Sequence, residues 1–97
     1  MSVTVLLEIT VPPEKSAAVE AMLAEMLVDT RKFDGCISVD AIRNQDDPGN
    51  VFLIERWQTR DHHARYNAWR AETGASSSAA AELAATYDIR WYDTLAV

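Results

Sequence analysis

Residues 35–70 read GCISVDAIRNQDDPGNVFLIERWQTRDHHARYNAWR, and this stretch decides the fold. A Gly-Cys pair opens a run of strand-forming residues from Cys36 to Arg43, and the sequence Gln-Asp-Asp-Pro-Gly-Asn then turns the chain around. A second run, from Val51 to Trp57, ends in Glu-Arg-Trp. The two runs predict an antiparallel hairpin, and in the first of them we expect one face to hold the apolar side chains Ile37, Val39 and Ala41.

A helix is expected directly after the hairpin. Thr59 is a residue type that caps helices, and Gly74 can end a helix that runs to about Thr73. This segment carries two histidines, a tyrosine and a tryptophan.

The chain before residue 35 predicts a strand and a helix. Apolar and polar residues alternate between Val3 and Val11, which is the period of a half-buried strand, and Pro12-Pro13 ends it. Apolar residues then recur at steps of three and four up to Phe33, which predicts an amphipathic helix that begins near Pro13 and stops before Gly35. The positions on its core-facing stripe are Val19, Met22, Leu23, Met26, Leu27, Thr30 and Phe33.

Beyond residue 74 the sequence predicts a short helix and a last strand. Ser76-Ser77-Ser78 is interpreted as a cap and link, an alanine-rich helix is expected at about Ala79 to Thr86, and a strand at about Asp88 to Leu95. The order is β-α-β-β-α-β with one extra short helix, which is the ferredoxin-like α+β arrangement with an antiparallel sheet. Helices would cover one face of that sheet, and a second copy of the chain would cover the other, so a homodimer is expected.

Composition excludes several classes of protein. The 97 residues predict a single domain over residues 1–97. The formal net charge of −6, without a basic run, argues against nucleic acid as a partner. The single cysteine, Cys36, excludes an internal disulfide and fits a cytoplasmic protein. No apolar run approaches the ~20 residues of a membrane helix, and Val3 to Val11 lacks the basic leader of a signal peptide.

The first group of candidate functional residues lies on the helix after Trp57. His62, Tyr66 and Trp69 share one stripe of this helix, and His63, Tyr66 and Arg70 share an adjacent one. Aromatic faces can stack on a flat molecule, arginine can hold an oxyanion, and histidine can take the proton of a phenol. The alternative is that Tyr66 and Trp69 belong to the core, with the histidines and Arg70 at its edge.

The adjacent histidines do not predict a metal site. Consecutive helix residues point about 100° apart, so that His62 and His63 cannot readily hold one ion, and no third ligand lies at a suitable spacing. Cys36 is expected to pack in the core rather than act as a nucleophile, because no base is adjacent to it in the sequence.

A second group surrounds the end of the Val51 to Trp57 strand. Glu55 and Trp57 would share one face of this strand, and Arg56 would take the other. Glu8 would lie near Glu55 if their strands were neighbours, and such a carboxylate pair could carry out acid–base chemistry. The alternative is that these residues form salt bridges at a subunit interface.

Cofactor motifs are absent from the sequence. It contains no Gly-rich dinucleotide loop, no phosphate-binding loop, no Gly-x-Ser-x-Gly and no zinc-binding pattern of cysteine and histidine. An enzyme of this sequence is therefore expected to work without nicotinamide, flavin or a metal held by these motifs.

The order of Gly35-Cys36, Asp47-Pro48, Glu55-x-Trp57 and the helix at Thr59 resembles the antibiotic biosynthesis monooxygenase family. The resemblance implies a dimeric α+β barrel with a pocket between each sheet and its helices. It also implies oxidation of quinols or polyketides without a cofactor, in which the substrate anion gives an electron to dioxygen. Many members carry histidine where this chain has Tyr66. Heme is not expected, because no histidine follows His63.

These observations lead to two functional hypotheses. The first is a cofactor-independent monooxygenase, an oxidoreductase acting on a small aromatic hydroquinone or phenol. His63 would be base or orienter, Tyr66 a proton donor or hydrogen-bond partner and Arg70 the oxyanion holder. The substrate would be bound by a set of four side chains, namely Trp57, Trp69, His62 and Glu55. The second hypothesis is a non-catalytic dimeric protein, ligand-binding or stress-associated, with the same pocket.

Overall fold

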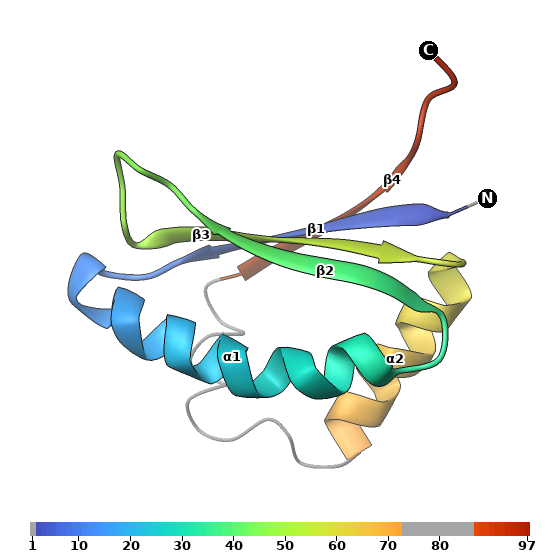
Figure 1. Ribbon diagram of the computed structural model, residues 1–97, viewed down its shortest axis with the longest axis horizontal. Helices are drawn as coiled ribbons and strands as arrows, with labels where there is room; N and C mark the ends of the chain where they lie inside the picture. Colours follow the sequence, from blue (N-terminus) through green and yellow to red (C-terminus); the bar gives the residue numbers. More distant parts are fainter. Residues whose placement is uncertain (1, 73–86) are drawn as a thin grey trace.

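The computed structural model describes residues 2–72 and 87–97 and shows one antiparallel sheet with helices on one face (Figure 1). The elements in chain order are β1 (Val3–Thr10), the short 3-10 helix η1 (Pro13–Lys15), α1 (Ser16–Lys32), β2 (Cys36–Arg43), β3 (Asn50–Trp57), α2 (Arg60–Glu72) and β4 (Tyr87–Asp93). The strands lie in the order β2-β3-β1-β4, and every neighbouring pair is antiparallel. The ferredoxin-like α+β fold is thereby confirmed. The expected stop at Gly74, the serine link and the alanine-rich helix lie outside the described residues.

The predicted alternation in β1 and the stripe on α1 together form the main core. Val19, Leu23 and Leu27 are buried on α1, and they meet Ile9 of β1. The remaining buried members of this cluster are Val39 of β2 and Val51 and Leu53 of β3. Because the spacing of four residues repeats along α1, one stripe of the helix lies over the sheet for most of its length.

The β2–β3 hairpin forms as predicted but contains an irregularity that the sequence pattern did not reveal. Cys36 lies opposite Trp57, whereas Ser38 lies opposite Arg56, so one extra residue, Ile37, is accommodated between them. Ile37 is consequently 51% exposed, while Val39 is buried against the helices. The expectation that Ile37 shares a face with Val39 was therefore wrong, because the bulge interrupts the two-residue period.

The second face of the sheet carries no helix among the described residues (Figure 1). Leu6 lies opposite Ile54, and Phe52 lies opposite Ile42, which is 51% exposed. These four residues, here called the open-face patch, form an apolar area in the middle of the sheet. Among the described residues, no helix is long and apolar enough to cross a membrane.

Candidate active site

Aromatic residues gather where β3 ends and α2 begins. Trp57 is completely buried and Tyr66 is 7% exposed, and their ring centroids lie 5.1 Å apart. Phe33, at the end of α1, lies 5.4 Å from the Tyr66 ring and 5.5 Å from the Trp69 ring. Trp91 of β4 completes the group, because antiparallel pairing places it opposite Val5 on the helix-covered face.

A buried carboxyl group and a buried imidazole face one another inside this aromatic cluster. Glu55 is 3% exposed and His63 is 1% exposed, and the Oε1 of Glu55 lies 3.8 Å from the Nε2 of His63. The indole N–H of Trp57 donates a hydrogen bond of 2.9 Å to the same carboxyl oxygen. The predicted sharing of one strand face by Glu55 and Trp57 is confirmed, and Arg56 is exposed on the other face.

The hydrogen bonds of His63 define which ring nitrogen carries its proton. The indole Nε1 of Trp91 lies 3.1 Å from the Nδ1 of His63, and an indole N–H can only donate. The Nδ1 atom of His63 is therefore the acceptor, and the neutral ring carries its proton on Nε2, the nitrogen that faces Glu55.

Burial shifts the pKa values of this pair toward their neutral forms. Burial, together with the positive charge of Arg60, lowers the pKa of His63 to about 4. Burial also raises the pKa of the Glu55 carboxyl, against the hydrogen bond from Trp57 and the charge of Arg70. Oppositely shifted neighbours of this kind are a recognised feature of acid–base sites.

The hydroxyl of Tyr66 belongs to a buried network that joins the two helices. It lies 2.6 Å from the Oγ1 of Thr30, which is itself 3.2 Å from the carbonyl oxygen of Met26. The Nε of Arg70 donates a 2.7 Å hydrogen bond to the Tyr66 hydroxyl, and its Nη2 donates to Met26 and Thr30. These contacts favour a role for Tyr66 in fixing α2 against α1, which was the alternative interpretation of the aromatic stripe.

His62 lies on a different side of α2 from His63. Its backbone N–H donates to the Oγ1 of Thr59, which confirms Thr59 as the cap of α2, and its Nδ1 lies 2.7 Å from the same oxygen. The ring occupies the space beside Gly35, where any Cβ would overlap it. These contacts assign His62 to the junction between α1, β2 and α2 rather than to the aromatic cluster.

Two further expectations can be compared with the structure. Strands β1 and β3 are neighbours, but Glu8 lies opposite Phe52 while Glu55 lies opposite Val5. Because these positions have opposite parity, Glu8 and Glu55 lie on opposite faces, and the suggested carboxylate pair does not form. Cys36 packs against both apolar clusters, as expected, and burial raises the pKa of its thiol.

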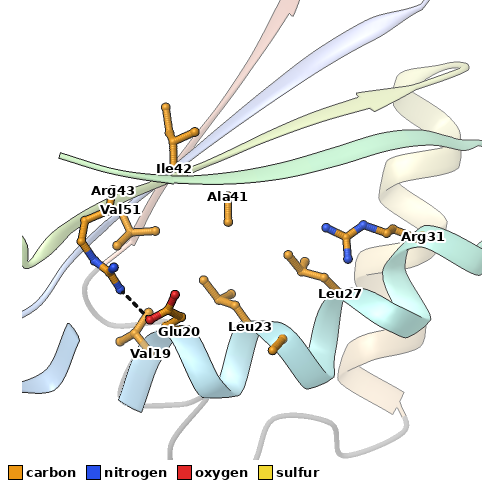
Figure 2. Close-up of a pocket in the computed structure, with 10 residues that line it drawn as sticks. Val19, Glu20, Leu23, Leu27, Arg31, Ala41, Ile42, Arg43 and Val51 are labelled. Carbon is orange, nitrogen blue, oxygen red and sulfur yellow. Dashed lines mark hydrogen bonds and ion pairs between the residues drawn. The ribbon is translucent and has the colours of Figure 1, made fainter. Parts of the chain in front are cut away.

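Neither of two cavities that lie among the described residues is lined by any of the seven predicted site residues. One has a volume of about 230 Å³ and lies between α1 and the β2–β3 hairpin (Figure 2). The other has a volume of about 320 Å³ and lies at the end of β1 and β4, where its wall includes Trp91 and Arg60. The Arg60 guanidinium lies 4.2 Å from the centre of the Trp91 ring. Because Trp91 contacts His63, the second cavity is separated from the Glu55–His63 pair by one side chain.

The sequence interpretation missed Thr30, Arg60 and Trp91 as parts of this site. Trp91 stands 28 residues after His63, and only the pairing of β4 with β1 brings them together. Thr30 lies on the predicted stripe of α1, but its partner Tyr66 is 36 residues away. Among residues 2–72 and 87–97, no group of three histidine, cysteine or acidic side chains could hold a metal ion.

Comparisons with known proteins agree with this fold. Residues 2–74 match the family model described as antibiotic biosynthesis monooxygenase. A crystal structure of a candidate antibiotic biosynthesis monooxygenase from Deinococcus radiodurans is 21% identical with a TM-score of 0.81, covering 98% of this chain and 94% of that one. A protein from Pseudomonas aeruginosa is 23% identical with a TM-score of 0.78, covering 98% and 95% of the two chains. A protein from Mycobacterium tuberculosis is 23% identical with a TM-score of 0.71, covering 98% and 96%. No curated protein matches the chain.

Proposed function

We propose that this chain, which belongs to the antibiotic biosynthesis monooxygenase family, oxidises a small aromatic hydroquinone or phenol with dioxygen and without a resident cofactor. One atom of dioxygen would enter the substrate ring and the other would leave as water. The substrate supplies the electrons, so that the protein has to bind the ring, remove a proton and exclude bulk water.

The observation that carries this proposal is the Glu55–His63 pair inside the aromatic cluster. The indole N–H of Trp91 marks the position from which a donor reaches the Nδ1 of His63. With the Trp91 side chain turned aside, a phenolic O–H in the position of its indole N–H would deliver its proton to Nδ1, and the Nε2 proton would pass to the Glu55 carboxylate. The distance of 3.8 Å between Nε2 and Oε1 has to shorten for this transfer, as catalytic hydrogen bonds often do when a substrate binds.

The surrounding residues suit supporting roles. The Trp57 N–H holds the Glu55 carboxyl in place. Burial raises the pKa of Glu55, and the positive charge of Arg70 opposes this rise and so favours the ionised, proton-accepting form. We place the substrate ring in the cavity beside Trp91, where Arg60 is available to the developing oxyanion. Tyr66, which is held by Thr30 and Arg70, would support the His63 ring from inside the aromatic cluster. Trp69 would pack behind Tyr66.

The test is dioxygen uptake with a panel of hydroquinones and phenols. Glu55→Gln and His63→Gln keep the size of each side chain, and each should lower the rate by about 10²-fold or more. His62→Gln is the matched comparison, because His62 is tied to Thr59 and Gly35 outside the cluster. Rates that stay unchanged in both Glu55→Gln and His63→Gln, with an active wild type, would refute the assignment of the pair.

A further inference from the structure

The cleft between α1 and the β2–β3 hairpin lies apart from the residues to which the oxidation is assigned. Val19, Leu23 and Leu27 line it from α1, and Ala41 and Val51 line it from the strands (Figure 2). The volume is about 230 Å³. An apolar cavity of about 150 Å³ holds benzene, so this cleft has room for about nine non-hydrogen atoms.

The shape of the cleft follows the helix axis. Val19, Leu23, Leu27 and Arg31 are spaced four residues apart on α1, and all four line the cleft. Each step of four residues advances about 6 Å, so that Leu23 and Arg31 lie about 12 Å apart along the axis. Because the apolar lining residues follow one another along the helix, the cleft suits an extended hydrocarbon chain better than a compact ring system.

The two ends of the cleft differ in charge. At one end the Nη2 of Arg43 lies 3.3 Å from the Glu20 carboxylate, which neutralises it. At the other end Arg31 donates one hydrogen bond, of 3.0 Å, to the carbonyl oxygen of Val39. Within residues 2–72 and 87–97, no carboxylate lies within salt-bridge distance of Arg31. Since a guanidinium has five N–H donors, Arg31 can still bind an anion at this end.

We propose that the cleft binds a straight-chain monocarboxylate of about eight to ten carbon atoms, whose hydrocarbon chain of about seven to nine carbons lies in the cleft and whose carboxylate lies at its end. Its carboxylate pairs with Arg31, and its chain lies over Leu27 and Leu23 beneath Ala41 and Val51. Glu55 and His63 do not line this cleft, so binding here stands independently of the proposed oxidation.

The first measurement is a titration of the isotopically labelled protein with octanoate, followed by nuclear magnetic resonance. We expect saturable shifts of the amide signals of Leu23, Leu27, Arg31 and Val51. Along the series hexanoate, octanoate, decanoate, each added methylene that is buried should tighten binding about two- to fourfold. Shifts that do not saturate, or that centre on the open-face patch, would overturn the proposal.

Three variants separate the head group from the chain. Arg31→Gln should weaken octanoate binding about three- to tenfold, because a charge-assisted pair at the surface is lost. Arg56→Gln removes the same charge from the opposite face of the sheet and should leave the affinity unchanged. Ala24→Glu places a carboxylate in the cleft from an exposed helix position and should prevent binding. Equal affinity in wild type and Arg31→Gln, or a loss in Arg43→Gln instead, would contradict the assignment of the head group.

Discussion

At the scale of single residues, Glu55 and His63 impose opposite pH dependences on folding. The pKa of His63 in the folded chain is lowered to about 4 from its ordinary value near 6.5. Between pH 4 and pH 6.5, the unfolded chain therefore binds a proton at His63 and the folded chain does not. Stability contributed by neutral His63 is thus present above pH 6.5 and is lost as the pH falls through this window. The raised pKa of Glu55 acts in the other direction, and its contribution decreases as the pH rises above the ordinary value.

The first prediction concerns His63 and pH. The difference in unfolding free energy between wild type and His63→Gln should increase by up to about 3 kcal/mol between pH 4 and pH 6.5 and then level off. This difference in unfolding free energy is measured by urea unfolding of both proteins at one fixed protein concentration, repeated at several pH values across this range. A difference that is flat with pH would show that the imidazole is not held neutral by the fold.

The second prediction concerns Tyr66. Tyr66→Phe keeps the ring but removes the buried hydroxyl that Thr30 and Arg70 contact, and it should cost about 1–3 kcal/mol of unfolding free energy. Thr30→Val should lower the unfolding free energy less in the Tyr66→Phe background than in wild type, because both changes remove the same hydrogen bond. A Tyr66→Phe variant of unchanged stability but greatly reduced rate would instead favour the proton-donor role for its hydroxyl.

At the scale of elements, Gly35 joins three parts of the fold. Its φ of 89° lies in the left-handed region, and it ends the turn between α1 and β2. Its carbonyl oxygen accepts a 2.8 Å hydrogen bond from the N–H of Gln58 after β3. Its missing side chain leaves the space that the His62 ring occupies at the start of α2.

The third prediction follows from this junction. Gly35→Ala should lower the unfolding free energy by more than the ~1–2 kcal/mol that a left-handed backbone costs an L-residue, because the new Cβ also overlaps His62. His62→Ala in the same background should recover only the part of the steric cost that comes from the ring, because the Cβ of residue 62, 2.5 Å from the new Cβ, remains. Thermal unfolding of the two single variants and the double variant separates these contributions. A Gly35→Ala variant as stable as wild type would refute this account of the junction.

The same elements show what the sequence could predict. Local periodicity and caps were enough for β1, α1, the hairpin, the cap at Thr59 and the ferredoxin-like order of elements along the chain. Ile37 was assigned to the wrong face of β2, because a bulge depends on how two strands pair and not on the sequence of one strand. Glu8 was paired with Glu55 incorrectly, because only the register shows that they have opposite parity. Trp91 was missed as a partner of His63, because contact between residues so distant in sequence depends on the assembled sheet.

At the scale of the whole molecule, the open-face patch bears on assembly. Leu6, Ile42, Phe52 and Ile54 lie on a sheet face that α1 and α2 do not cover (Figure 1). We propose that residues 1–97 form one domain and that a second copy covers this face, because apolar sheet faces are usually buried.

The fourth prediction tests this assembly. Light scattering at micromolar concentration should give the mass of a dimer, and Ile42→Asp on the open face should shift it toward monomer. Val28→Asp is the matched control, because Val28 is 47% exposed on α1 and Ile42 is 51% exposed on β2. A wild type that has a clean monomer mass would remove the dimeric barrel from the account.

The oxidation itself is tested most directly by following the oxygen atoms. Protein that has been exhaustively chelated, and that shows no flavin or heme absorbance, is incubated with the hydroquinone panel under ¹⁸O₂, and the products are analysed by mass spectrometry. The account predicts a product with one labelled oxygen atom in the ring, and loss of this product in Glu55→Gln. The absence of turnover across the panel, label found only in water or peroxide, or activity that returns only when a metal or flavin is added would contradict it.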